Sequence, residues 1–169
     1  VSVRVYPALI PREHPLGAVR GAFNAVFVEA VAAGSLMFYG AGAGGVQTAS
    51  AILGDLVSAA KRHVAGGPGL ADSVHANLPV LPIDAVNTRY QITLETSDAP
   101  GVLAKVATIV ADGGVSIETV EQNADDKTTA TIEIGTHEAT DAALTKVVNH
   151  LAASDVVESV ISVLRVEGI

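Results

Sequence analysis

The residues with the clearest chemical potential form a loop almost free of side chains. Gly40 to Gly45, in FYGAGAGGVQTASAILGDL, contain four glycines in six residues directly ahead of a segment with helical spacing. Glycine allows tight turns, and free N–H groups at a helix start bind anions. Val46 follows where a Walker motif needs Lys-Ser/Thr, and no acidic residue stands at the distance that a Rossmann fingerprint requires. By itself the loop is therefore either a mechanical turn or a phosphate-binding loop.

A second candidate site is the turn SDAPGVL, from Ser97 to Leu103. Pro100 is tolerated near a helix start, and Gly101 brings bare backbone close to whatever lies outside the turn. Free N–H groups at such a start suit a carboxylate, and the Asp98 carboxylate suits an ammonium group. An amino acid carries both groups, so the turn is a candidate amino-acid site. The alternative is an ordinary turn in which Asp98 caps the helix.

The histidines favour structural roles. His14, beside Glu13 at a strand-to-helix junction, is assigned a structural hydrogen bond in preference to acid–base chemistry. The other four histidines lack the spacing of metal ligands, and the chain has no cysteine. No metal site is therefore predicted.

The amino-acid turn lies within a longer alternating pattern. RYQITLETSD predicts a half-buried strand, and VLAKVATIVADGG places Val102, Val106 and Val110 on one helical face. VSIETVEQN, the polar turn ADDK and TTATIEIG predict a hairpin. EATDAALTKVVNHLAAS predicts a second helix and VVESVISVLRV a last strand. The order βαββαβ predicts two helices on one face of a four-stranded antiparallel sheet, which is the ferredoxin-like arrangement.

The glycine loop also stands between predicted elements. VSVRVYPALIP alternates like a strand that ends at Pro11, and NAVFVEA and GSLMFYG predict two more strands before the loop. TASAILGDLVSAAKRH predicts a helix after it, with Thr48 or Ser50 near the start and basic residues in the last turn. The loop therefore opens a helix, as a phosphate-binding loop does.

Composition and charge exclude several classes of function. The 169 residues are 49% hydrophobic, which is enough for one domain or two small ones. Residues 1–88 carry no net charge and residues 89–169 carry the whole excess of −8, which argues against nucleic acid as a partner. No membrane-spanning run or signal pattern is present, so we expect a cytoplasmic protein without a membrane partner. The chain begins at Val1 and its only methionine is Met37, which predicts a piece of a longer protein.

Residues 89–169 resemble an ACT domain, a small regulatory module of amino-acid biosynthesis, and DAPGVLAKVATIVADGGVSIETVEQ carries the resemblance. In that family the glycine-containing turn and the following strand bind an effector amino acid at the interface of two ACT units, whose edge strands pair. The resemblance therefore implies an effector site made of two groups of residues. They are Asp98, Ala99, Gly101, Val102 and Leu103 in the turn, and Ser116, Ile117, Gln122 and Asn123 in the strand.

The upstream residues carry a second resemblance. EHPLGAVRGAFNAVFVEAVAAGSLMFYGAGAGGVQTASAILGDLVSAAK is similar to the end of the catalytic region of the homoserine dehydrogenase family. An ACT domain after a proline-rich linker is also the arrangement in that family. One departure is Ala41, where many relatives have proline or lysine. The resemblance implies a loop that closes near the phosphates of NADP or NAD. Its cofactor-binding residues would be Gly42, Ala43, Gly44, Thr48 and Ser50.

Together the resemblances imply one function. It is hydride transfer between NAD(P) and the pair L-homoserine and L-aspartate 4-semialdehyde, in threonine and methionine biosynthesis. The ACT resemblance adds L-threonine as effector and a homo-oligomer formed by ACT pairing. The family's nucleotide-binding domain and catalytic lysines precede this region, so no catalytic residue is assigned and the chain alone is expected to be inactive. The alternative is a stand-alone ACT-type module for amino-acid binding or dimerisation.

The predicted organisation is α+β in three parts. Residues 1–63 form a partial α/β substrate or dimerisation segment from the homoserine dehydrogenase catalytic region. Residues 64–88 form a linker rich in proline and glycine, and residues 89–169 form a ferredoxin-like βαββαβ ACT domain. The apolar strands of residues 1–45 are expected to leave exposed apolar patches.

Overall fold

The computed structural model of the chain describes residues 1–66, 78–124 and 128–168. The chain forms two compact units. The first consists of Val1–Pro11 and Leu78–Ile169, and the second of Arg12–Asn77. The first eleven residues therefore belong with the C-terminal part of the chain, and not with the residues that follow them directly.

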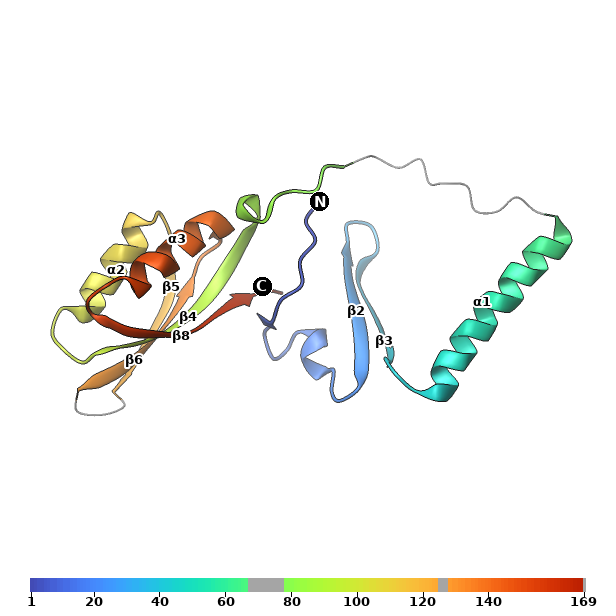
Figure 1. Ribbon diagram of the computed structural model, residues 1–169, viewed down its shortest axis with the longest axis horizontal. Helices are drawn as coiled ribbons and strands as arrows, with labels where there is room; N and C mark the ends of the chain where they lie inside the picture. Colours follow the sequence, from blue (N-terminus) through green and yellow to red (C-terminus); the bar gives the residue numbers. More distant parts are fainter. Residues whose placement is uncertain (67–77, 125–127, 169) are drawn as a thin grey trace. The chain divides into compact units, whose positions relative to one another are not determined.

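The first unit is an antiparallel sheet with two helices on one face (Figure 1). Four strands follow the spatial order β8-β4-β6-β5. The chain visits them as strand, helix, strand, strand, helix, strand, so the predicted ferredoxin-like βαββαβ order is confirmed. The elements are β4 (Asn87–Ser97), α2 (Val102–Asp112), β5 (Ile117–Ala124), β6 (Thr129–Thr136), α3 (Asp141–Ala152) and β8 (Val157–Val166), with β7 (Ala139–Thr140) beside the start of β4.

The core of this unit lies between the sheet and its helices. Residues of β4 alternate between buried and partly exposed positions, as the period-two pattern of the sequence predicts. Ile92, Leu94 and Ile132 from the strands and Val106 and Leu144 from the helices have no exposed surface. The aliphatic residues at inward positions therefore form one contiguous cluster.

Residues 1–11 do not form the long strand that their alternation predicts. Only Ala8–Leu9 pairs, as β1, and it runs parallel to the end of β8. The prediction of a strand over residues 1–11 is therefore wrong, because only the end of β8 offers this segment a paired edge. Two further backbone hydrogen bonds hold the segment: Leu81 N–H donates to Val1 O at 2.8 Å, and Glu167 N–H donates to Leu9 O at 2.9 Å.

The described ends of the predicted 64–88 linker are ordered. Helix α1 of the second unit continues to Ala65, and the 3-10 helix η2 (Ile83–Ala85) leads into β4. Val86 is buried, and its carbonyl accepts a hydrogen bond from Asp141 N–H at 2.9 Å. Residues from Leu78 onward therefore belong to the first unit. Residues 67–77, and Asp125 to Lys127 of the predicted ADDK turn, lie outside the described residues.

The second unit contains a short 3-10 helix, a hairpin and a long helix. These are η1 (Pro15–Ala18), β2 (Phe23–Ala30) paired antiparallel with β3 (Gly34–Ala41), and α1 (Gly45–Ala65). Both predicted strands and the helix after the glycine loop are thus confirmed. None of the residues from 12 to 66 is buried. The expected exposed apolar surface is also present, and it includes Val26, Phe38, Ile52 and Leu56.

Candidate functional site

The turn after β4 has an open backbone. Gly101 is the N-cap of α2 and has a φ of 91°, in the left-handed region where a side chain is strained. Apart from Gly101 and its chain neighbours, no heavy atom of the described residues lies within 4 Å of the position that a Cβ would take there, so the turn is open on that side. No side chain caps α2, so the alternative in which Asp98 caps this helix is wrong. In the first turn, Val102 N–H donates to Ala99 O at 3.3 Å and Lys105 N–H donates to Gly101 O at 2.9 Å, whereas the N–H groups of Leu103 and Ala104 have no backbone acceptor among the described residues.

Asp98 stands beside these groups with an exposed side chain. Its N–H donates to Thr128 O at 2.9 Å, which fixes its backbone. Its exposed carboxylate has no hydrogen bond or ion pair with any residue that the structure describes. A free carboxylate next to free helix N–H groups suits the two charged ends of an amino acid. Ala99 and Leu103 are exposed as well, whereas Val102 is 5% exposed and packs into the core.

The predicted strand residues fall at opposite ends of β5. Asn123 lies two strands away from Glu95, near the end of β4 that leads into the turn. Ile117 lies at the other end of the sheet, about 20 Å along the strand direction at ~3.3 Å per residue. Within one chain, Gln122 and Asn123 therefore share an end of the sheet with the turn, whereas Ser116 and Ile117 do not.

Pairing with a second copy would remove this separation. β5 is the outermost strand on the side away from β8. When two such edges pair antiparallel around a two-fold axis, the start of one β5 lies beside the end of the other. Ser116 and Ile117 of one copy would then approach the turn of its partner. Ser116 and Ile117 already line a hollow of about 400 Å³ with Ala107, Ala111 and Gly114, whose small side chains leave room for approach.

The glycine loop opens α1 as predicted. Gly44 is the N-cap, no side chain caps the helix, and its first turn contains no acidic residue. A Cβ at Gly42 would lie 1.9 Å from Asn24 Nδ2, and one at Gly44 would lie 2.1 Å from Gln47 Oε1. The bare loop thus allows two amide side chains to approach its backbone. Gly42 and Asn24 also line a hollow of about 240 Å³ at the end of the hairpin.

The other predicted cofactor residues differ in position. Ala43 lies in the loop itself and is exposed. The helix begins at Gly45, and Thr48 N–H donates to Gly44 O at 2.9 Å, so Thr48 lies in the first turn. Ser50 lies two residues farther along, in the second turn of α1. The free N–H groups at the helix start therefore belong to the residues between Gly44 and Thr48.

The remaining candidates have structural roles or form no site. His14 Nδ1 accepts a hydrogen bond from Leu16 N–H at 3.2 Å, and its ring meets Phe27 edge-on with centroids 4.6 Å apart. The predicted structural hydrogen bond is thus confirmed. Within residues 1–66, 78–124 and 128–168, no three His, Asp or Glu side chains gather as metal ligands do. No helix in those ranges is long and apolar enough to cross a membrane.

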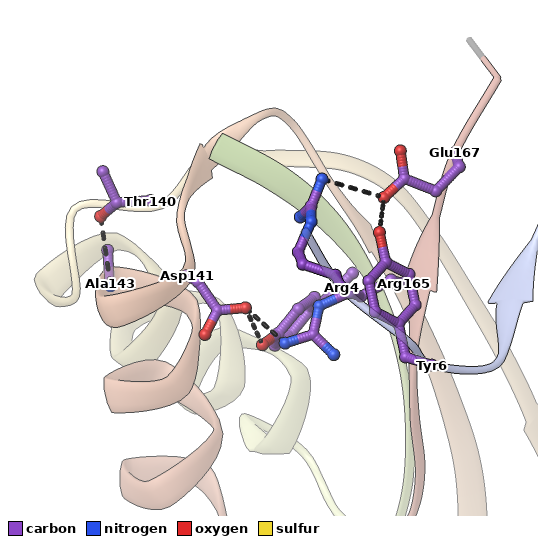
Figure 2. Close-up of polar contacts among 8 residues, drawn as sticks. Arg4, Tyr6, Thr140, Asp141, Ala143, Arg165 and Glu167 are labelled. Carbon is purple, nitrogen blue, oxygen red and sulfur yellow. Dashed lines mark hydrogen bonds and ion pairs between the residues drawn. The ribbon is translucent and has the colours of Figure 1, made fainter. Parts of the chain in front are cut away.

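A polar cluster that the sequence did not predict surrounds the first residue of α3 (Figure 2). Asp141 is buried and accepts hydrogen bonds from Arg165 Nη2 at 2.6 Å and from the Tyr90 hydroxyl at 3.0 Å. The Arg165 guanidinium also lies 4.7 Å from the ring centroid of Tyr6 and 5.5 Å from that of Tyr90. Burial raises the pKa of Tyr90; a hydrogen bond with Thr145 lowers it and the one with Asp141 raises it further. The only local signal for this cluster is a lone arginine in the apolar strand VLRV.

Comparisons with known proteins match both halves of the chain. Residues 1–57 match the family model of homoserine dehydrogenase, and residues 90–155 match that of the ACT domain. A homoserine dehydrogenase of Mycobacterium leprae (strain TN) is 54% identical over 100% of this chain and 40% of its own length. One of Corynebacterium glutamicum is 45% identical over 99% of this chain and 37% of its own length.

Solved structures agree with this match. The crystal structure of a homoserine dehydrogenase from Thiobacillus denitrificans has a TM-score of 0.88 and 36% identity, over 98% of this chain and 39% of that one. The chain thus spans about 40% of the length of these curated relatives. The resemblances found in the sequence are confirmed: residues 1–57 belong to the homoserine dehydrogenase family, and an ACT domain follows them at residues 90–155.

Proposed function

We propose that the chain is the part of a homoserine dehydrogenase that completes the catalytic region and carries its regulatory domain. The observation that carries this proposal is 54% identity with the M. leprae protein along the whole chain, through both family matches in one order. The full-length protein transfers a hydride between NAD(P) and the pair L-homoserine and L-aspartate 4-semialdehyde. It does so in the cytoplasm, in threonine and methionine biosynthesis.

The glycine loop supplies the cofactor contact of this chain. Bound NAD(P) supplies the hydride donor or acceptor. Gly42, Ala43 and Gly44 would hold its phosphates through backbone N–H groups, and the first turn of α1 has no acidic residue to repel them. Thr48 and Ser50 are secondary contacts. No catalytic residue is assigned to this chain, and purified alone it should not oxidise NADPH with aspartate semialdehyde. Measurable turnover by the 169-residue chain would refute this assignment.

The ACT domain binds an effector amino acid, L-threonine, between two copies of the chain. Asp98 pairs with the ammonium group, and the open turn at Gly101 gives backbone N–H groups to the carboxylate. Ser116 and Ile117 of the second copy close the site around the side chain. Gln122 and Asn123 flank it from the end of β5. The exposed Asp98 carboxylate, which has no partner among the described residues, and the position of β5 at the edge of the sheet favour this arrangement.

Calorimetric titration with L-threonine, together with the mass of the chain in solution, tests the effector site. We expect saturable binding by a dimer, and much weaker binding of L-serine and L-lysine. Asp98→Asn should weaken binding by roughly tenfold or more because it removes one charge-assisted contact. Asp112→Asn removes an equal charge from the exposed far end of α2 and is the matched control. No binding of any of the three amino acids, or binding by a monomer, would contradict the proposal.

Mixing two defective variants tests whether the site is shared. Asp98→Asn damages the turn, and Ser116→Lys fills the start of β5 with a long charged side chain. In a mixed dimer, one of the two sites combines the intact turn of one chain with the intact β5 start of the other. Random pairing in an equal mixture makes about half of the dimers mixed, so about a quarter of the wild-type number of sites should be regained. A site contained in one chain would regain none.

One observation favours the alternative of a stand-alone module. The first unit has a closed core, whereas the second has no buried residue among those described. A chain of residues 78–169 that binds threonine as tightly as the whole chain would show that sensing needs nothing from residues 12–66.

A further inference from the structure

Residues 1–11, here called the strap, lie in the part of the chain that matches homoserine dehydrogenase but pack on the unit that contains the ACT domain. The strap is attached at several points. Leu81 N–H donates to Val1 O at one end, and β1 pairs with β8 at the other. Between these points, the side chains of Arg4 and Tyr6 turn toward the unit while Val3 and Val5 face outward, 77% and 101% exposed.

The inward side chains of the strap meet the end of β8. The Tyr6 hydroxyl donates a hydrogen bond to the Glu167 carboxylate, and Arg4 Nη2 lies 3.6 Å from the same carboxylate (Figure 2). The Tyr6 ring also covers the Arg165 guanidinium, whose centre is 4.7 Å from the ring centroid. A cation over an aromatic face is attractive, and more so when partly desolvated. The strap is therefore held by directional polar contacts and by one ring-on-guanidinium contact.

Arg165 joins the strap to the start of α3. The same guanidinium that Tyr6 covers donates to Asp141, the first residue of that helix. Asp141 in turn accepts from Tyr90 in β4. One side chain thus touches the strap, a central strand and a helix terminus. A movement of α3 against the sheet would change the contact that holds the strap.

The contacts that hold the strap are mainly polar. No strap side chain belongs to the buried aliphatic core. Among the described residues, Arg4 Nη1 and Arg165 Nε are buried without a hydrogen-bond partner. Buried donors without a partner lower the net gain from a polar contact. The strap is therefore less firmly fixed than the strands of the sheet.

We propose that the strap is a releasable mechanical connection between the ACT unit and the homoserine dehydrogenase region, separate from the chain that joins residues 66 and 78. Residue 12 follows the strap directly, so tension or release at Arg165 is passed along the backbone into the second unit. The connection works by chain continuity and docking, and it does not depend on which amino acid the ACT domain binds. The ACT unit is thereby tied to the upstream region at both ends of residues 12–77.

Cutting the chain tests the strap directly. A recognition sequence for a site-specific protease is introduced within residues 67–77 of the full chain, which is then cut and passed through a sizing column. We expect the two fragments to elute together, because the strap stays docked on the larger one. In the variant Arg4→Ala/Tyr6→Ala the dissociation constant of the cut fragments should rise at least about tenfold, since the guanidinium contact and the Glu167 contacts are lost together.

Two further variants separate the strap from general stability. Arg165→Lys keeps the charge near Asp141 but loses the planar group under Tyr6, so it should also weaken retention. Lys105→Ala removes an exposed ion pair with Asp155 in the same unit and should leave retention unchanged. Fragments that separate without any strap substitution would overturn the proposal. Fragments that stay together with equal affinity in Arg4→Ala/Tyr6→Ala would overturn it too, because another contact would then hold them.

Discussion

The two units use similar side chains and reach opposite degrees of burial. Leu144 in α3 has no exposed surface, whereas Leu56 in α1 is 60% exposed. Both leucines lie on amphipathic helices. The difference is that α3 lies on a sheet of several strands, whereas the described residues of the second unit contain a single two-stranded hairpin. Secondary structure therefore follows from the local sequence, but burial needs a second layer.

Helix α1 shows that local sequence can define the end of a helix even where no core covers its apolar residues. Gly66 ends the helix in the left-handed conformation, with a φ of 66°, and its N–H bonds back to the last turn. Arg62 and His63 stand in that turn, where the helix dipole favours positive charge. The helix is thus well specified at its C-terminus while its apolar residues remain exposed. The matched relatives are longer than this chain. In those relatives, we expect the additional residues to cover the apolar faces that correspond to these.

The largest expected effect comes from one truncation made in both units. Leu144→Ala should cost about 2–5 kcal/mol of unfolding free energy, because it leaves a cavity in the closed core. Leu56→Ala should cost only a few tenths of a kcal/mol in this chain, since the leucine is already mostly in water. Hydrogen exchange resolved by segment measures the two units separately. An equal loss of protection from both substitutions would show that α1 has a packing partner.

The glycines offer a second contrast between the units. A Cβ at Gly113 would lie 2.2 Å from Val147 Cγ2, a buried core atom, so Gly113→Ala should destabilise the first unit by about 1–3 kcal/mol. Gly54 lies within α1 with no atom within 4 Å of its Cβ position, so Gly54→Ala should stabilise that helix by about 0.5–1 kcal/mol.

Circular dichroism during denaturation measures both glycine substitutions. The expected outcome is a shift of opposite sign in the two variants. If Gly54→Ala destabilised α1, the added methyl group would have to clash with another part of the protein that packs on this face of the helix. If Gly113→Ala were neutral, Val147 would have to move at little cost.

The sequence predicted most where one segment carries its own pattern. The alternation in β4 and the valines of α2 were sufficient for the ferredoxin-like order, and the motif around Gly101 located an open turn. It predicted less where the answer depends on a distant partner. The strap alternates like a strand, but its partner is the end of β8, more than 150 residues away, and that edge pairs with only two of its residues.

The candidate effector site was also only partly predictable. Asp98 and Ile117 lie near the two ends of one sheet, and neither a motif nor a helical period reports that separation. The linkage of Arg165 with Asp141, Tyr90 and Tyr6 depends on the register of three strands and a helix start. Such contacts exist only in the assembled fold, so no local pattern in the sequence predicts them.

The smallest expected effect is a difference in how alkaline pH changes hydrogen-exchange protection in the strap and in the core. Burial raises the pKa of Tyr6 above 10.0, and its hydrogen bond and repulsion from Glu167 raise it further, while Arg4 and Arg165 oppose the rise. A raised pKa means that docking favours the neutral phenol, so the contribution is complete below pH 10.0 and is lost as pH rises through the folded-state value. Exchange protection at β1 should therefore fall above that pH before protection of Ile92 and Ile132 falls. Tyr6→Phe lacks the ionising group and should remove this early step; persistence of the step in Tyr6→Phe would assign it to another group.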